Sequence, residues 1–417
     1  MISYQNSRRI LNKAKIKIKN ESILSINSLN RVSASNIYAK FNYPSGDNAA
    51  FDGYAINSND TKNLNKNKSK AFKIIGSISA GKKPINKRIN KYEAVEIMTG
   101  GIVPKGFDTI IPIEQVIVYP DKKNQKSIII NKKINKYNHV RFAGSDYKKN
   151  ELVIKKNTII LPNHILALKT LGITKINVKK KINILFFSTG NEISNKDLIP
   201  DWKVRNSNSH YIQSLNNSFL FNFNNGGILR DNHQNIFKTK IKKILNSKID
   251  ILITSGAVSA GKYDYIPGIV KTLNLSHYFK SVAIRPGKPI LFAKIQGKQK
   301  AIFGLPGNPM SSSACFRFFV YPFIANILGL EVEKPVKAIL KNDFLKKKKF
   351  TRFAKSKLNT TKDGKIEVSI LKGQESFRIK SFVKSNIWAL LPAGKSKFKK
   401  GEIIDCYFPN NPNQSLI

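Results

Sequence analysis

The chain has 417 residues, of which 73 are Lys or Arg and 25 are Asp or Glu, so its formal net charge is +48. Hydrophobic residues make up 41% of the sequence, which is enough for packed cores and excludes a wholly disordered protein. Two cysteines, Cys315 and Cys406, exclude a disulfide framework and a four-cysteine zinc site, and they favour a cytoplasmic protein. The sequence shows neither an apolar run of roughly 20 residues nor the apolar core of a secretory signal, so we expect no membrane span and no export.

The positive charge also raises the possibility of a nucleic-acid-binding protein. However, 62 of the 73 basic residues are Lys and only 11 are Arg, and the lysines are spread along the whole length. A recognition surface normally uses more Arg, because its guanidinium makes bidentate contacts with phosphates and bases. We therefore interpret most of the charge as a solvated surface, with no specific nucleic-acid partner, that binds polyanions loosely at low salt.

The first 178 residues predict a helix followed by β-rich segments. Residues 1–25 have the apolar spacing of a helix, and residues 45–55 form a Gly- and Asp-rich loop. From about residue 70 to 160 the sequence consists of short strand-like runs, broken by Gly, Pro and Lys/Asn clusters, as is typical of small β domains. We expect β-rich linker and substrate-lid domains over 26–178. The expected strands are Tyr54–Ile56, Ala71–Ser77, Ala94–Met98, Thr109–Ile113 and Ser127–Ile130.

Residues 179–331 predict a parallel, doubly wound α/β domain of three layers, because continuous apolar strands alternate with helices. Pro335 then opens a second run of alternating strands, which predicts a C-terminal β domain over 332–417. The elements expected in the α/β domain are a strand at Lys181–Phe187, a helix at Ser207–Phe221, a Gly-Gly turn, a strand at Ile228–Leu229, a helix at Ile236–Asn246, strands at Asp250–Thr254 and Ala301–Phe303, and a helix at Ser311–Leu328.

Three loops follow strands of the predicted α/β domain, where open α/β sheets bind their ligands. They are Ser188–Glu192, Ser255–Gly261 with Asp264 just beyond, and Gly304–Pro309, which leads into a helix. Their glycines let backbone N–H groups approach a ligand, and a helix N-terminus favours an anion. Three such loops at one sheet edge favour a phosphorylated ligand over ordinary strand–helix turns.

Charged residues beside these loops extend the prediction. Lys288 lies in Arg285-Pro286-Gly287-Lys288-Pro289, where two cations flank a rigid turn, an arrangement suited to an oxyanion. Acidic residues are few, yet several lie in or beside Gly-containing turns, where they could hold Mg²⁺ or could be helix caps and Asx turns; the sequence leaves both open. These residues are Asp52, Asp146, Glu192, Asp231 and Asp264.

Taken together, the motifs resemble those of the molybdopterin molybdenumtransferase family, which includes a domain of the scaffold protein gephyrin. The segment from Pro44 to Ala55 is similar to the family signature D-N-S-A-M-D-G-Y-A, and Glu96–Gly101, with Pro104, Gly106, Asp108 and Glu114, to R-I-M-T-G-A…P-x-G-A-D…E. The other matching segments follow in the family order: Arg141–Asp146, Ser188–Glu192, Asn206–Asn208, Asp231, Ser255–Asp264, Pro286–Pro289, Gly304–Pro309 and Gly373–Pro392.

The resemblance implies a homodimer of four-part subunits, each with an N-terminal helix (1–25) packed on the central domain. It implies an Mg²⁺-dependent transferase that inserts molybdenum from molybdate into adenylylated molybdopterin, releases AMP and could contact the molybdopterin adenylyltransferase transiently. It assigns catalytic roles to Asp52, Thr99, Asp146, Glu192, Asp231, Asp264 and Lys288, with Glu192, Asp231 and Asp264 as metal ligands. It assigns substrate binding to Ser188, Thr189, Gly190, Ser255, Gly256, Ser259, Gly261, Arg285, Gly287, Pro306, Gly307, Asn308 and Ser376.

Several positions depart from the family pattern, and they leave an alternative open. A molybdopterin-binding or scaffold protein of the same fold, with weakened chemistry, would also retain most of these motifs. The family's acidic residues are kept, as are Thr99 and Lys288, and this favours the enzyme. The acidic residues are Asp52, Asp146, Glu192, Asp231 and Asp264. The departures are Ala49, Phe51, Ser145, Asn191, Ala257, Arg285 and the loosened Gly373–Ser376 segment.

Overall fold

The structure, a computed structural model, describes residues 1–121, 126–215, 220–258 and 264–409. The chain divides into two compact units. Unit 1 comprises Met1–Ser35, Lys156–Leu161 and Asn177–Ile417, and unit 2 comprises Asn36–Lys155 and Pro162–Ile176. The predicted class, a multidomain protein with α/β and β parts, is confirmed. The described residues contain no helix long and apolar enough to cross a membrane.

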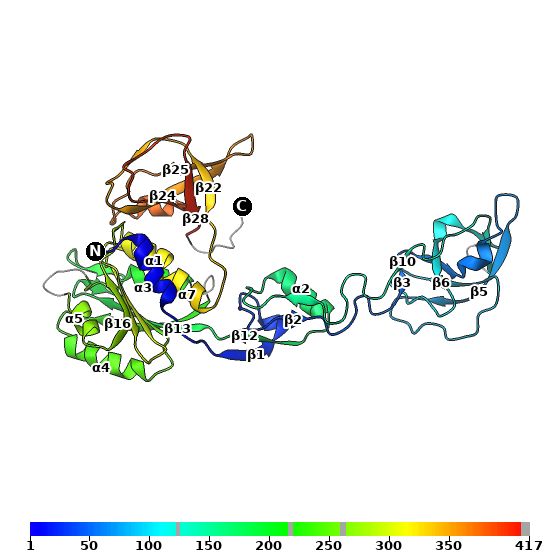
Figure 1. Cartoon of the computed structure of the whole chain (residues 1–417), viewed down its shortest axis with the longest axis horizontal. Coiled ribbons are helices and arrows are strands. Elements are labelled where there is room, and N and C mark those ends of the chain that lie inside the picture. The colour runs from blue at the N-terminus through cyan, green and yellow to red at the C-terminus, as the bar shows by residue number, and fades with distance from the viewer. Residues whose placement is uncertain (122–125, 216–219, 259–263, 410–417) are drawn as a thin grey trace. The chain divides into compact units, whose positions relative to one another are not determined.

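Unit 1 is built around a six-stranded sheet in the order β16-β13-β17-β21-β20-β18. The first four strands are parallel; β17 and β21 are buried along their whole length and β13 along most of it, because helices cover both faces of the sheet. The edge strand β16 is buried only at its two ends. Figure 1 shows α4 and α5 on one face and α1, α3 and α7 on the other. The strands are β16 (Phe221–Leu229), β13 (Ile182–Thr189), β17 (Ile251–Ser255), β21 (Ala301–Leu305), β20 (Leu291–Ile295) and β18 (Leu275–Lys280), and the helices are α1 (Tyr4–Lys13), α3 (Ser207–Ser214), α4 (Gln234–Leu245), α5 (Ile266–Lys271), α6 (Pro309–Cys315) and α7 (Tyr321–Ile327).

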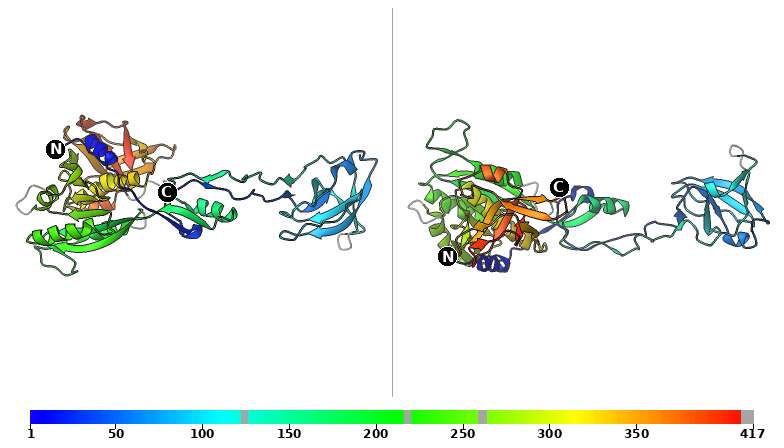
Figure 2. Two further views of the ribbon diagram at one scale, coloured as in Figure 1. Left: turned by 60° about the horizontal axis from the view of Figure 1, so that its bottom comes forward. Right: turned by 90° about the horizontal axis from the view of Figure 1, so that it is seen from above.

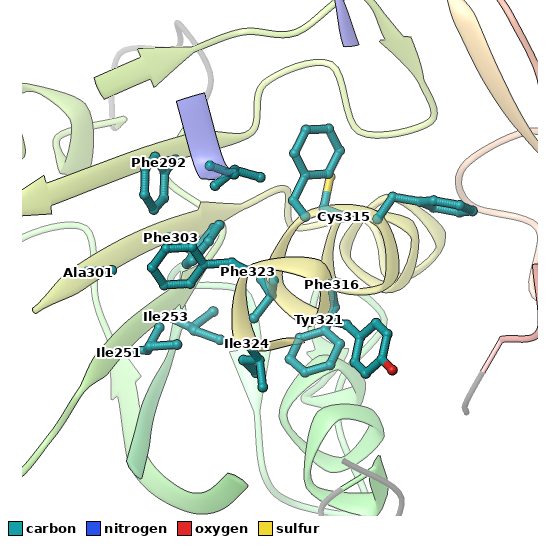
Figure 3. Packing of buried hydrophobic residues seen from close by; sticks show 14 of the residues in the cluster. Ile251, Ile253, Phe292, Ala301, Phe303, Cys315, Phe316, Tyr321, Phe323 and Ile324 are labelled. Atoms are coloured by element: carbon teal, nitrogen blue, oxygen red, sulfur yellow. The ribbon is translucent and has the colours of Figure 1, made fainter. Parts of the chain in front are cut away.

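The larger apolar core lies between this sheet and the helical run from α6 to α7. Phe292 and Phe303 of the sheet pack against Phe323 of α7, with ring centroids 5.3 and 5.6 Å from it (Figure 3). Leu11 of α1 belongs to the same core, so the N-terminal helix covers this face of the sheet. A five-residue π-helical segment, Phe316–Val320, joins α6 to α7, where the sequence predicts one uninterrupted helix.

Three sequence predictions for unit 1 are wrong in detail. The N-terminal helix ends at Lys13, and residues Asn20–Leu24 form strand β1 instead of extending a helix to residue 25. Helix α3 ends at Ser214, and Phe221 begins strand β16, which includes the two glycines expected in a turn. Gly226 lies against the ring of Phe187 on β13, where a Cβ would come within 2.3 Å, so this strand position needs glycine for packing.

The sheet also carries an antiparallel edge where a fully parallel one was predicted. β20 pairs antiparallel with both β21 and β18. The connections explain the difference, because a short turn at Gly297 joins β20 to β21 and no helix lies between β18 and β20. Only a long crossover connection can return a strand in parallel.

The C-terminal part of unit 1 is a second six-stranded sheet, as the alternating strands predict. It packs onto the central helices: Phe318 stacks on Phe353 of β24 at a centroid distance of 3.9 Å. Buried Arg317 donates to the Phe408 carbonyl at 2.6 Å and pairs with Glu333. The elements are β19 (Ile284–Arg285), β22 (Val336–Leu340), β23 (Phe344–Leu345), β24 (Thr351–Thr360), β25 (Ile366–Ile370), α8 (Lys380–Val383), β26 (Ile387–Leu391), β27 (Lys397–Phe398) and β28 (Ile403–Tyr407).

Unit 2 contains a third sheet, in the order β7-β4-β6-β5-β9-β8, which Figure 2 shows in blue and cyan. β4 (Gly53–Ile56), the second strand from one edge, is fully buried and has antiparallel partners on both sides. The other strands are β5 (Lys70–Ile78), β6 (Glu93–Ile97), β7 (Thr109–Pro112), β8 (Ile117–Tyr119) and β9 (Ser127–Ile130). Shorter elements of the first half of the chain are β2 (Ile37–Tyr38), β3 (Asn48–Ala49), β10 (Val140–Arg141), β11 (Leu152–Ile154), α2 (Pro162–Thr170) and β12 (Lys175–Lys179).

Candidate functional site

The three predicted ligand loops meet at one edge of the central sheet, because β13, β17 and β21 are neighbouring parallel strands. Asn208 on α3 joins two of these loops. Its side-chain amide donates to the Ser255 hydroxyl at 2.7 Å and to the Gly307 carbonyl at 2.8 Å. The Ser255 hydroxyl in turn donates to the Pro306 carbonyl at 3.2 Å. Ser255, Pro306 and Gly307 therefore belong to one site.

The loop after β13 is attached to the same edge. The Ser188 hydroxyl donates to the Asn206 side-chain oxygen at 2.6 Å, and the Thr189 hydroxyl donates to the Ser255 carbonyl at 2.9 Å. Both residues are buried; the Thr189 hydroxyl holds the ends of β13 and β17 together, and the Ser188 hydroxyl attaches β13 to the residue that precedes α3. The Gly190 amide donates to the Leu229 carbonyl of β16, which places this glycine between two strand ends.

Arg230 organises the loop that carries Glu192. One guanidinium nitrogen, Nη1, donates to the carbonyls of Gly190, Asn191 and Ile193 at 3.0, 3.1 and 2.8 Å. The Glu192 carboxylate folds back over Gly190, where a Cβ would lie 2.4 Å from Oε2. The same loop is bonded to Asp231, whose backbone amide donates to the Asn191 side-chain oxygen at 3.2 Å. Glu192 and Asp231 thus come from adjacent strand ends.

The Asn308 side chain connects the central domain with the C-terminal sheet. Its amide donates to the Ser376 hydroxyl at 3.2 Å, so the structure brings these two predicted substrate-binding residues together. Asn308 is also the residue that precedes helix α6, which opens with Pro309. Asn308 thus links the start of α6 to the loop that carries Ser376.

A pair of arginines lies beside this contact. Arg285 of β19 and Arg352 of β24 are directly opposite each other in a parallel strand pair. Burial, and then the charge of Arg285, lower the pKa of Arg352. Within the described ranges, Nε of Arg352 is buried and has no hydrogen-bond partner. The Glu375 carboxylate acts against this lowering of the pKa of Arg352, and the Arg285 guanidinium lies over the Phe350 ring, 4.8 Å from its centroid. The two arginines place two positive charges side by side.

Lys288 and Gly287 form the turn that follows β19. Gly287 has a φ of +102° and lies against the buried thiol of Cys315, which donates to its carbonyl at 3.5 Å. Burial raises the pKa of the Cys315 thiol far above its usual range, so this cysteine packs beneath the turn as a neutral group. Lys288 itself is exposed. The turn is thus held by its contact with Cys315 on the buried side, and Lys288 faces the solvent.

Asp52, Thr99 and Asp146 belong to unit 2. The Asp52 carboxylate accepts hydrogen bonds from the Thr99 amide at 2.6 Å and from the Thr99 hydroxyl at 2.7 Å, and these bonds lower its pKa. Asp52 is therefore held in its charged form. Asp146 lines an open cavity of about 660 Å³ together with Arg141 and Ser145.

The remaining predicted residues are not gathered into a metal centre. Asp264 lies just before α5, while Ser259 and Gly261 fall outside the described residues. Over the ranges that the structure describes, no group of three or more His, Cys, Asp or Glu side chains could hold a metal ion. Glu192, Asp231 and Asp264 thus do not form a preformed three-carboxylate site there.

Three residues that build this site are not predicted from the sequence. They are Arg230, Arg352 and, in its role of joining two loops, Asn208. In a chain with 73 basic residues, a single Arg gives little signal. Asn208 does lie in one of the matched motifs, which is the only hint of its role.

Three family models match consecutive parts of the chain. The MoeA N-terminal region (domain I and II) matches residues 2–172, and the MoeA C-terminal region (domain IV) matches residues 337–408. Between them, residues 186–326 match a model described as a probable molybdopterin binding domain. That middle match covers the three loops and the helices around them.

Individual proteins are similar over nearly the whole length. The molybdopterin molybdenumtransferase of Staphylococcus aureus strain COL is 33% identical over 382 residues, which are 91% of this chain and 88% of that protein. The enzyme of the same name from Staphylococcus epidermidis strain RP62A is 31% identical over 407 residues, 97% and 94% of the two chains. The solved molybdopterin biosynthesis moeA protein of Pyrococcus horikoshii OT3 has a TM-score of 0.82 at 26% identity and covers 98% of this chain and 100% of its own.

Proposed function

The chain belongs to the molybdopterin molybdenumtransferase family, as a transferase of molybdenum cofactor biosynthesis, and we propose that it moves molybdenum from molybdate to adenylylated molybdopterin with release of AMP. The observation that carries the proposal is the junction of three strand-end loops: Asn208 joins the loops that carry Ser255 and Gly307, and the Thr189 hydroxyl joins the third to Ser255. Backbone N–H groups and hydroxyls gathered at the ends of parallel strands suit a phosphorylated ligand.

We assign molybdate to the region of Arg285, Arg352 and Ser376. Molybdate is a compact dianion, and two guanidinium groups in opposed strand positions supply two positive charges. The Ser376 hydroxyl, held by Asn308, adds a hydrogen-bond donor beside them. Lys288 follows Arg285 by three residues and contributes a mobile point charge at the same turn.

The residues present are compatible with Mg²⁺ as a cofactor shared with the substrate. Mg²⁺ prefers hard oxygen ligands, keeps several waters and is usually held by one or two carboxylates plus substrate phosphates. Glu192 and Asp231, at adjacent strand ends, are the carboxylates that would hold it. When bound, the ion would polarise the phosphoanhydride bond. The chain's own part is to keep the two carboxylates in place through Arg230 and Asn191.

We further propose that the protein acts as a homodimer and that a second subunit completes the site. Asp52, Thr99 and Asp146 lie in a separate compact unit from the loops and Lys288, so the predicted catalytic residues fall into two sets. A dimer related by two-fold symmetry could supply one set from each subunit. A transient contact with a molybdopterin adenylyltransferase would deliver the substrate.

A turnover assay tests the proposed function. Purified protein, adenylylated molybdopterin, molybdate and Mg²⁺ should give AMP and a molybdenum-loaded product, and leaving out either molybdate or Mg²⁺ should abolish the release. Tight binding of the substrate without any AMP release at saturating Mg²⁺ would instead identify a binding or scaffold protein. Binding of nucleic acid that depends on base sequence and withstands high salt would contradict the proposal more deeply.

A further inference from the structure

Lys355 is a lysine in the interior of strand β24 whose exposed fraction is only 2%. Its ammonium donates to three backbone carbonyls, those of Gly373, Arg378 and Glu375, at 2.7, 2.9 and 3.1 Å. Burial lowers its pKa to about 8, so the side chain remains mostly an ammonium at neutral pH. Three N–H groups then match three acceptors one to one.

All three acceptors lie in one loop, residues 373–378, which runs from the end of β25 towards α8. The same loop is attached to β24 through Gln374. Its side chain accepts from the Lys355 amide at 3.0 Å and donates to the Lys355 carbonyl at 2.7 Å. Arg352 adds a bond to the Gln374 carbonyl at 3.1 Å. The loop is therefore fixed mainly by residues of β24, with one further bond from the Ser381 hydroxyl of α8 to the Gly373 carbonyl at 2.6 Å.

Ser376 is at the centre of this loop and contacts Asn308 of the central domain. The ion pair between Glu375 and Arg378 lies at the surface, with side chains more than half exposed. Such exposed ion pairs contribute little to stability. The bonds from the buried Lys355 ammonium to the carbonyls of Glu375 and Arg378 hold the loop on both sides of Ser376, whereas the Gln374 bonds hold it on one side only.

We propose that Lys355 is a positioning residue: its ammonium fixes loop 373–378 so that Ser376 lies against Asn308 at the molybdate end of the site. Lys355 acts through Ser376 and does not touch substrate. The inference rests on the proposed function for its effect on turnover, while its effect on the loop is independent of what the enzyme converts. A buried lysine that merely filled space would be replaced by an apolar residue without consequence for Ser376.

The test compares Lys355→Met, Ser376→Ala and the double variant with a matched control, Lys357→Met. Lys357 is on the same strand two residues further along and is exposed. Lys355→Met and Ser376→Ala should each raise KM for molybdate about tenfold, as expected for a lost charge-assisted contact, with kcat within about twofold. The double variant should be no worse than the poorer single variant, because both changes remove the same contact. Additive losses, or an unchanged KM in Lys355→Met, would overturn the proposal.

Hydrogen–deuterium exchange on the ligand-free protein separates this inference from the proposed function. In Lys355→Met, the amides of residues 371–378 should exchange faster than in the wild type, including the Arg378 amide that donates to the Glu375 carbonyl. In Lys357→Met, their exchange rates should equal those of the wild type. Faster exchange in a protein whose wild type never turns over molybdate would sustain the positioning role and defeat the proposed function. Unchanged exchange would defeat the positioning role. If Lys355→Met fails to fold, Lys355→Gln, which keeps two N–H donors, undergoes the same measurements.

Discussion

At the scale of single residues, Lys288 is the clearest test of the anion site. Lys288→Ala should reduce kcat/KM about ten- to a hundredfold, because a charge-assisted contact contributes roughly 1.5–3 kcal/mol and each 1.4 kcal/mol is about a decade. The melting temperature should barely move, since the side chain is exposed. Lys349→Ala, at another exposed lysine, is the control. Equal small losses in both variants would show that Lys288 belongs only to the general basic surface.

The turn beneath Lys288 gives a second residue-scale prediction. A Cβ on Gly287 would lie 2.4 Å from the Cys315 sulfur, and the φ of +102° is unfavourable for any L side chain. Gly287→Ala should lower the free energy of unfolding by about 2–4 kcal/mol, through overpacking and backbone strain together. Urea denaturation measures it. Adding Cys315→Ala should recover the overpacking part only; complete recovery would show that the backbone carries no strain.

The sequence predicts residues of this site well where a motif is local and poorly where contacts are long-range. Asn308 and Ser376 are both identified from their own segments, yet the contact between them joins positions 68 residues apart. Lys355 has no local signal at all, because a lysine within an alternating strand is normally solvent-facing. Its burial follows from the loop that folds over it, which no short sequence window contains.

At the scale of elements, the loop 190–193 should depend on Arg230. Arg230→Met removes three hydrogen bonds to that loop while keeping the length of the side chain. We expect kcat/KM to fall about tenfold or more, because Glu192 is no longer held in position, and the free energy of unfolding to fall by about 1–3 kcal/mol for the lost hydrogen bonds. Arg9→Met, on an exposed face of α1, is the control. A variant that unfolds readily but retains full activity would make Arg230 a stabilising residue only.

The elements of the central sheet show why periodicity alone leaves some boundaries open. The Ser207–Phe221 segment has helical spacing, but Phe221 and Phe223 are strand residues of β16 and pack on the sheet core. Strand β16 contains two glycines that favour a turn in isolation. Packing of Gly226 on the Phe187 ring overrides that preference, and only the neighbouring strand β13 provides the ring.

At the scale of the whole molecule, the division of the proposed catalytic residues between two units, together with the proposed homodimer, predicts complementation between subunits. An Asp52→Asn subunit and a Lys288→Ala subunit should each be nearly inactive as homodimers. If each site draws unit 1 from one chain and unit 2 from its partner, random mixing should restore about a quarter of wild-type activity, because half of the dimers have one intact site. Mixed subunits that stay inactive would place both sets of residues in one chain.

The insertion of unit 2 within unit 1 has a consequence for how the protein is made. Residues 1–35 belong to a unit whose other parts begin at residue 156, and the guanidinium of Arg8 donates to the carbonyl of Phe318, 310 positions later. At roughly 5–20 residues per second, a ribosome needs about 15–60 s to cover that distance. During this time α1 has emerged with its apolar face unpaired, while unit 2 is already complete. Residues of α1 thus wait for packing partners that are synthesised only after the whole of unit 2.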